Sequence, residues 1–121
     1  MLFRSDKPHP RSYGTFARKL GYYSIREQVL PLEQAVRSST GLPAEILGLT
    51  DRGYVRVGLA ADIVVFDPKT FIDRATFQQP HQYSAGVKFV FVNGRPAVFN
   101  GQPTGALAGK SLRHESKTES E

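Results

Sequence analysis

The sequence of 121 residues contains no cysteine. It therefore has no disulfide framework, no thiolate nucleophile and no cysteine-based zinc site. Long apolar runs are also absent, because none approaches the roughly 18 residues of a membrane-spanning helix, and we predict no membrane association. The opening MLFRSDK lacks the apolar segment of a signal peptide. We predict a cytoplasmic location, although a cysteine-free chain is compatible with any compartment.

Several motifs of catalytic and nucleotide-binding sites are missing as well. The chain has no Gly-x-Ser-x-Gly nucleophile elbow, no P-loop and no Gly-x-Gly-x-x-Gly fingerprint. Its histidines are His9, His81 and His114, and they form neither a His-x-His pair nor a His-Glu-x-x-His motif. Because a catalytic zinc needs at least three protein ligands and an open position, we expect this chain alone to bind no metal.

Positive charge is concentrated in residues 1–26. The net charge is +5, and this segment holds six basic residues against Asp6 alone, while the remainder of the chain is balanced. Two interpretations are open. The segment is either a solvated basic face, which composition favours, or the entrance of a site that attracts anionic substrates. A nucleic-acid patch is the third, but the segment lacks interleaved aromatics and known binding motifs, so we predict no nucleic-acid partner.

The first half of the chain has the apolar spacing of helices. Phe16, Leu20 and Tyr23 recur at intervals of four and three within a predicted helix over residues 13–28. Gly21, in the middle of this helix, costs about 1 kcal/mol relative to alanine and weakens the prediction of an unbroken helix.

Two shorter helices are predicted to follow. Pro31 opens the second in its first turn, where a missing N–H does no harm, and Gly41 ends it. The third covers residues 43–47 and ends at Gly48. The side chains expected to face the core are Leu32, Ala35, Val36 and Ser39 in the second helix, and Leu42, Ile46, Leu47 and Leu49 around the third.

From about residue 51 the apolar period changes to that of strands. Residues 53–58 predict a short strand or a turn, and residues 63–66 and 87–92 predict strands. Asn93-Gly94 predicts a hairpin, from which a strand returns over residues 95–99. The connection between the first two predicted strands, residues 69–85, is expected to be held by its aromatics Phe71, Phe77 and Tyr83.

These patterns predict an α+β chain in three parts: residues 1–49, residues 50–113 and a disordered polar tail over residues 114–121. Three or four strands make a poor sheet by themselves, and open edges rich in Val and Phe favour aggregation. We therefore expect these strand edges to pair with a second copy, with another polypeptide, or with nothing.

The segment SDKPHPRSYGTF, residues 5–16, places an Asp, a His and an Arg within six residues. Polar groups so close together usually lie at the mouth of a site. The segment is followed, in order, by TGLPAEILGL, TDRG, ADIVVFDP, FIDRATF, VFVNGRPAV and GKSLR. From about Ser5 to Arg113 the chain resembles the C-terminal part of the D-aminoacylases, which are N-acyl-D-amino-acid deacylases of the amidohydrolase superfamily.

This resemblance implies the last βα unit of a TIM-type barrel, its following helices and part of a small β-sandwich. In the family, zinc is the cofactor and an N-acyl-D-amino acid is hydrolysed to a carboxylate and the free D-amino acid. Since the family's remaining metal ligands have no counterpart here, we expect a C-terminal fragment that is inactive alone. The alternatives are half of a split deacylase, completed by a barrel-half polypeptide, and a non-catalytic interaction or dimerisation module.

Asp6 corresponds to the carboxylate that the family uses to transfer a proton, beside the metal or its water. The resemblance thus makes Asp6 the candidate catalytic residue and the one possible metal ligand. From composition alone, an Asp shortly before Pro8 and a helix is a turn or capping residue.

Arg11 and His9 are the candidate substrate-binding residues. Arg11 resembles the family's arginine for the substrate α-carboxylate, which a guanidinium group can bind through two parallel hydrogen bonds. Without the resemblance, a surface Arg paired with Asp6 or Glu27 is the simpler interpretation. His9 is a neighbour of the implied metal site, although a His between two prolines more often has a structural role.

Overall fold

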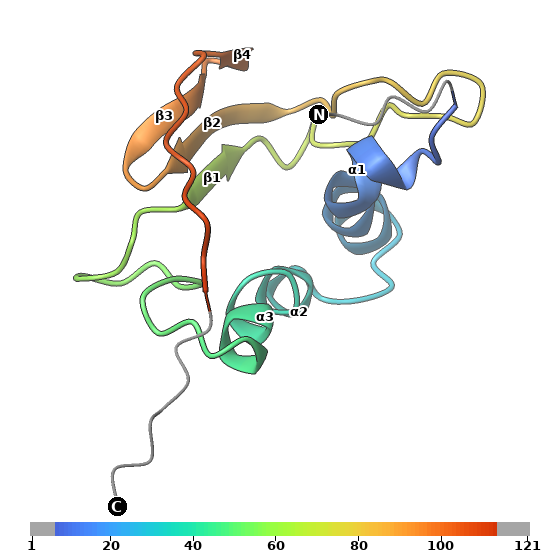
Figure 1. Ribbon diagram of the computed structural model, residues 1–121. Coiled ribbons are helices and arrows are strands. Elements are labelled where there is room, and N and C mark those ends of the chain that lie inside the picture. Colours follow the sequence, from blue (N-terminus) through green and yellow to red (C-terminus); the bar gives the residue numbers. More distant parts are fainter. Residues whose placement is uncertain (1–6, 114–121) are drawn as a thin grey trace, which may run out of the picture.

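The computed structural model describes residues 7–113 and shows a helical layer beside a four-stranded antiparallel sheet (Figure 1). The α+β class is therefore confirmed. The predicted disordered tail, residues 114–121, lies outside the described residues. No helix within residues 7–113 is both long and apolar enough to cross a membrane.

The first helix is continuous although its hydrogen bonding changes along its length. It consists of α1 (Arg11–Ala17) and a π-helical continuation, η1 (Arg18–Arg26), and the two residues at the junction both keep helical dihedral angles. The helix predicted over residues 13–28 is thus confirmed, but it begins two residues earlier, at Arg11. It ends where Gln28 adopts a positive φ of 51°.

Gly21 is the point at which the second half of the chain packs on this helix. A Cβ atom at Gly21 would lie 3.0 Å from the carbonyl carbon of Phe71 and closer still to its oxygen. Only glycine allows the two backbones to approach so closely. One guanidinium nitrogen of Arg26 donates to the carbonyls of both Gly21 and Phe71, at 2.5 and 2.8 Å. The residue that weakened the helix prediction therefore makes the tertiary contact possible.

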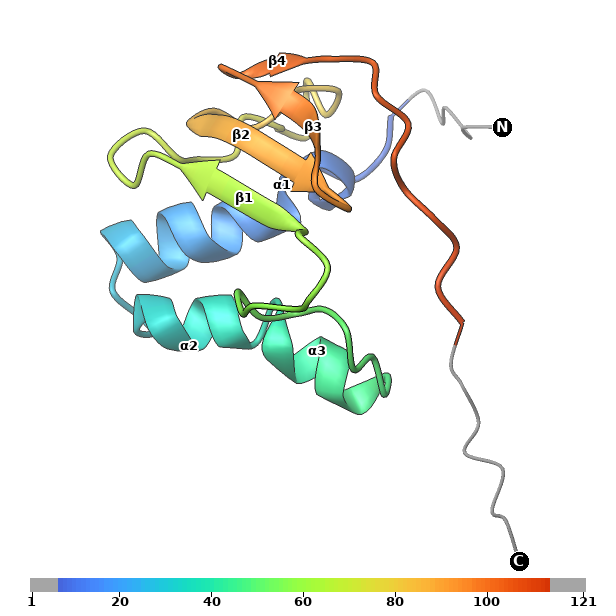
Figure 2. The same cartoon turned by 90° about the vertical axis from the view of Figure 1, so that its left-hand side faces the viewer.

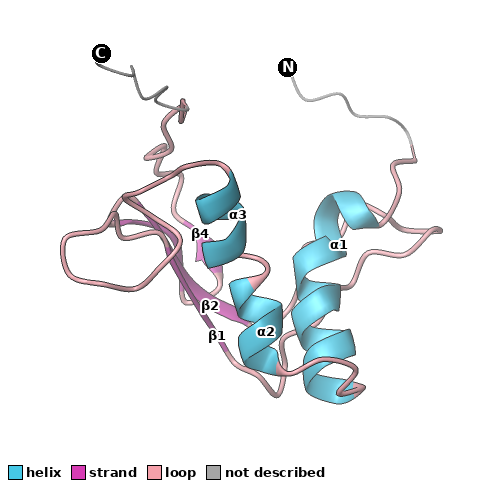
Figure 3. Cartoon of the chain, turned by 90° about the horizontal axis from the view of Figure 1, so that it is seen from below, coloured by secondary structure: helices cyan, strands magenta, loops and turns pink. Residues whose placement is uncertain are grey.

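Two short helices, α2 (Leu32–Arg37) and α3 (Gly41–Ile46), follow the first (Figure 3). The second predicted helix is present, with Pro31 as the residue before its first turn and Ala35 completely buried. It ends at Arg37, so the prediction that Gly41 ends it is wrong, and Gly41 is the first residue of α3. The third, predicted over residues 43–47, is also present and begins two residues earlier than predicted.

The prediction that Ile46 and Leu47 complete the core is wrong, because their side chains are 75% and 57% exposed. The buried residues of α3 are Gly41 and Ala44. The Tyr54 ring lies so close to Gly41 that a Cβ atom there would overlap it. The short helix therefore packs most closely through its smallest residues and leaves Ile46 in solvent.

All neighbouring strands of the sheet are antiparallel, and the strand order follows the sequence (Figure 2). The strands are β1 (Ile63–Phe66), β2 (Val87–Val92), β3 (Arg95–Phe99) and β4 (Gln102–Pro103). The first three have the predicted bounds. Asn93 and Gly94 have φ angles of 49° and 77°, as a type I′ hairpin requires. Residues 53–58 form turns rather than a strand.

Phe71 joins the helices to the sheet. It is 7% exposed, it packs in one apolar cluster with Leu20 and Ala35, and its ring centroid lies 4.5 Å from that of Phe66 in β1. The expectation that aromatics hold the connection over residues 69–85 is thus confirmed for Phe71. The other two, Phe77 and Tyr83, are 69% and 81% exposed and contact the rings of His9 and Tyr13.

We expect Gly21→Ala to destabilise the chain by about 1–3 kcal/mol, because the added methyl group forces the Phe71 backbone away from the helix. Gly109→Ala is the matched control, since a Cβ atom at Gly109 meets no atom within 4 Å. Urea unfolding followed by circular dichroism measures both variants. Equal stability of the two would contradict the packing described for Gly21.

Candidate functional site

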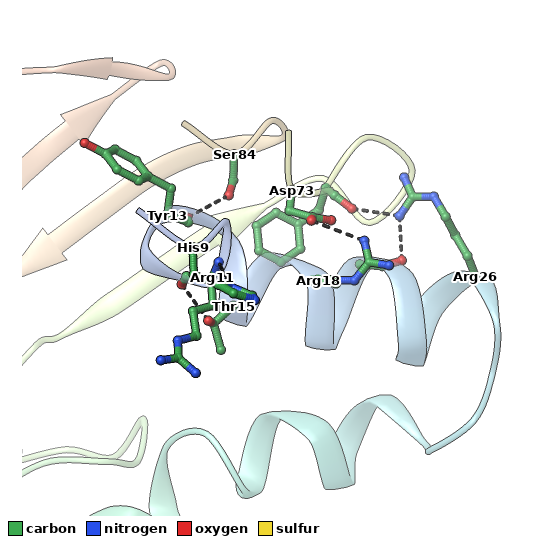
Figure 4. A network of polar contacts seen from close by, with 10 residues as sticks. His9, Arg11, Tyr13, Thr15, Arg18, Arg26, Asp73 and Ser84 are labelled. Carbon is green, nitrogen blue, oxygen red and sulfur yellow. Dashed lines mark hydrogen bonds and ion pairs between the residues drawn. The ribbon is translucent and has the colours of Figure 1, made fainter. Parts of the chain in front are cut away.

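An open groove of about 590 Å³ runs between the first helix and residues 73–78. His9 and Arg11 line it at the N-terminal end of the helix, and Arg18 and Asp73 line it further along (Figure 4). The structure thus brings together two of the three site residues predicted from the sequence. The third, Asp6, lies outside the described residues.

Arg11, the first residue of α1, is solvent-exposed at the groove. Within residues 7–113, no acidic side chain forms an ion pair with it, so the alternative pairing with Glu27 is not formed. The side-chain hydroxyl of Thr15 donates to the main-chain carbonyl of Arg11 at 2.6 Å. A cationic side chain thus stands at the groove, on a first turn that this hydrogen bond links to Thr15.

His9 is held by two contacts rather than projecting freely. Its ring atom Nδ1 accepts a hydrogen bond from the main-chain N–H of Arg11 at 3.0 Å. Its ring also meets the ring of Phe77 edge-on, with the centroids 5.0 Å apart. The side chain therefore contacts both walls of the groove.

Arg18 and Asp73 form an ion pair across the groove. The nitrogen–oxygen distance is 3.4 Å, the Asp73 side chain is 8% exposed, and that of Arg18 is 49% exposed. The Arg18 guanidinium group also lies over the rings of Tyr22 and Tyr23, 4.7 and 5.5 Å from their centroids. Hydrogen bonding with Tyr23 and, to a smaller extent, the Asp73 carboxylate raise the pKa of Arg18 above its ordinary value.

Sequence reasoning did not single out Arg18, Asp73 or Phe77 as groove residues. Arg18 was counted only as part of the basic segment, and the other two belong to the connection after β1. Asp73 stands in FIDRATF, a motif that contributed to the family resemblance. That motif is the signal that could have drawn attention to the groove's second wall.

The described residues do not fit a catalytic zinc by themselves. Within residues 7–113, no three side chains of His, Cys, Asp or Glu lie close enough together to hold a metal ion. In addition, the Nδ1 atom of His9 already accepts the N–H of Arg11. Three ligands are the minimum for such a centre, so a metal would need donors from outside this range.

The model of the amidohydrolase family matches residues 1–98 of the chain. The chain belongs to the amidohydrolase family. It is 47% identical over 111 residues to D-aminoacylase from Alcaligenes xylosoxydans xylosoxydans, which covers 92% of this chain and 23% of that enzyme. It is also 48% identical to N-acyl-D-glutamate deacylase from the same organism, over 89% of this chain and 22% of that protein. This amidohydrolase chain therefore spans less than a quarter of these relatives.

Solved structures show the same partial likeness. A crystal structure of D-aminoacylase superposes with a TM-score of 0.83 and 48% identity, covering 86% of this chain and 22% of that one. N-acyl-D-glutamate deacylase from Bordetella bronchiseptica, complexed with zinc and a phosphonate inhibitor, superposes with a TM-score of 0.74 and 44% identity. The latter match covers 80% of this chain and 21% of that protein. The amidohydrolase likeness thus extends to the fold.

We expect the two charge-neutralising variants of the ion pair to differ in their effect. Arg18→Gln should cost about 1–3 kcal/mol, because it leaves the buried Asp73 carboxylate without its cationic partner. Asp73→Asn should cost about 1 kcal/mol or less, because the half-exposed guanidinium group keeps its hydration. Urea unfolding of both variants tests this order, and a larger cost for Asp73→Asn would contradict it.

Proposed function

We propose that this chain is the C-terminal part of a metal-dependent deacylase that hydrolyses N-acyl-D-amino acids. The observation that carries the proposal is its identity of 47–48% to D-aminoacylase and N-acyl-D-glutamate deacylase over about nine-tenths of its length. In this proposal the chain supplies the last βα unit of a barrel and part of a β-sandwich. The groove of this chain lines one side of the substrate site.

In this proposal Arg11 binds the α-carboxylate of the substrate. Its guanidinium group can form two parallel hydrogen bonds with the carboxylate oxygens, which fixes the orientation of the α-carbon. With the carboxylate held and the acyl group placed at the attacking water, the two stereoisomers differ in where the side chain lies, which allows selection of the D-isomer. Asp6 takes the proton from that water and returns it to the leaving amine.

The zinc that the family uses would be held by ligands outside residues 7–113, since the described residues do not bring three donors together. We therefore infer that the chain is inactive alone and becomes active when the remaining three-quarters of a D-aminoacylase are supplied. We use the term barrel half for this remaining polypeptide, which includes the rest of the barrel. It contributes the metal ligands, while this chain contributes Asp6 and Arg11.

The exposed apolar side chains support such a complementation. Val64 and Val65 of β1 are 54% and 43% exposed, and β1 has a partner strand on one side only within the described part of the chain. Ile46 of α3 and Leu47, which follows it, are also exposed. These surfaces are suited to contact with a further polypeptide. A non-catalytic module that binds a partner or a second copy through the β1 edge is the second candidate.

We expect the purified chain to hydrolyse neither N-acetyl-D-leucine nor N-acetyl-D-methionine with added zinc, because the metal donors are missing. Co-expression with the barrel half should restore turnover and bind zinc, as metal analysis of the same samples would show. Turnover by the chain alone that disappears in Asp6→Ala would overturn the inference of inactivity. If neither sample shows turnover or bound zinc, the result would favour the binding module.

In the complemented enzyme, Arg11→Ala should lower kcat/KM by about 10- to 100-fold, the equivalent of one lost charge-assisted hydrogen-bonded contact. Arg11→Lys should recover part of this loss, because an ammonium group keeps the charge but cannot form the planar two-bond contact. Arg95→Ala is the control, since Arg95 is an exposed residue of β3 away from the groove. Steady-state kinetics that rank all three variants alike would exclude the carboxylate role.

A further inference from the structure

The first helix begins without a capping side chain at the position where one is usual. That position is occupied by Pro10, with φ −51° and ψ −27°, and no side-chain hydrogen bond caps the helix from it. The first four N–H groups of any α-helix find no acceptor inside the helix. Their acceptors must therefore come from the residues that precede α1.

His9 supplies two of these acceptors. Its ring atom Nδ1 accepts from the N–H of Arg11 at 3.0 Å, and its main-chain carbonyl accepts from the N–H of Ser12, also at 3.0 Å. The carbonyl of Pro10 accepts from the next two N–H groups, at 3.2 and 3.1 Å. All four groups are thus satisfied, and only the one that belongs to Arg11 depends on a side chain.

The orientation of the His9 ring is set from the other wall of the groove. Phe77 meets it edge-on, with an interplanar angle of 80° and a centroid distance of 5.0 Å. Phe77 lies in the connection between β1 and β2 and is itself 69% exposed. Its large exposed ring contributes little to the core, so its contact with His9 is its clearest structural role.

The hydrogen bond also fixes where the His9 ring carries its proton. Nδ1 accepts from a donor and therefore bears no hydrogen, so in the neutral ring the proton resides on Nε2. If Nδ1 carried a hydrogen, its N–H group would face the main-chain N–H of Arg11, and two donors cannot form a hydrogen bond with each other. The observed first turn therefore requires Nδ1 of His9 to be the hydrogen-bond acceptor.

We propose that His9 is a positioning residue for Arg11. It acts through the main-chain N–H of Arg11 and holds the first turn of α1, from which the Arg11 side chain reaches the groove. This inference rests on the proposed carboxylate-binding function of Arg11. It differs from the substrate-binding role that the sequence predicted for His9, since positioning requires no contact between His9 and the substrate.

Steady-state kinetics of the chain co-expressed with the barrel half test this role. His9→Ala should raise KM about fivefold, the factor that matches one lost hydrogen bond, with kcat changed less than twofold. His9→Ala leaves the Arg11 guanidinium group, and so its orienting contact, in place. It weakens substrate and transition-state binding equally, which raises KM and leaves kcat nearly unchanged. His9→Asn should restore KM, because an Asn side chain can accept the N–H two residues further along.

His81→Ala is the matched control. His81 also contacts the first helix, with its Nδ1 atom 3.3 Å from the hydroxyl oxygen of Tyr13 and the two rings edge-on. It accepts no main-chain N–H of α1 and does not line the groove. A loss of helix packing alone would therefore affect both histidine variants, whereas positioning of Arg11 affects only those at His9.

NMR of the purified chain provides a test that does not require activity. We expect the His9 Nδ1 resonance to have the ¹⁵N shift of an unprotonated ring nitrogen, with the proton on Nε2. In His9→Ala the Arg11 amide should exchange with solvent roughly fivefold faster, and in His9→Asn it should exchange at the original rate. A proton on Nδ1, or unchanged exchange in His9→Ala, would overturn the inference.

The failure of this inference and the failure of the proposed function give different results. If Arg11→Ala raises KM but His9→Ala does not, His9 does not position Arg11. If His9→Asn is as impaired as His9→Ala, the imidazole itself contacts the substrate and the positioning role is wrong. If Arg11→Ala leaves KM unchanged, the proposed carboxylate binding fails, and the positioning role that rests on it fails too, whatever NMR shows of the contact.

Discussion

The close approach of two backbones at Gly21 and Phe71 is the constraint on which the rest of the structure depends. The absence of a side chain at Gly21 lets the Phe71 carbonyl reach the helix, and Arg26 donates to the carbonyls of both residues. The buried Phe71 ring then packs with Leu20 of the helix and with Phe66 of the sheet. One contact thereby fixes the helical half of the chain against the strands.

The candidate site is a consequence of this junction. The groove has one wall from the first helix and another from residues 73–78, which begin two residues after Phe71. The Arg18–Asp73 ion pair and the contact between His9 and Phe77 both cross from one wall to the other. The distance between the two walls therefore depends on the packing of Phe71 against Gly21.

The small core and the exposed apolar surface agree with a chain that spans less than a quarter of its relatives. Within the described residues, no large side chain is less than 2% exposed, whereas Val57, Val64 and Ile46 are largely open to solvent. Their exposure is the physical basis for proposing complementation by a further polypeptide.

The sequence by itself determined the local elements. Strand bounds, the Asn93-Gly94 hairpin and the second helix followed from β-branched runs, positive-φ residues and apolar spacing, which act over a few residues. The resemblance carried by the first motif also drew attention to His9 and Arg11, which line the groove. Only the tertiary structure decided that Gly21 is a contact point, that Ile46 remains exposed, and that Asp73 completes the groove. Those outcomes depend on which distant backbone packs against each position, and local pattern carries no information about that.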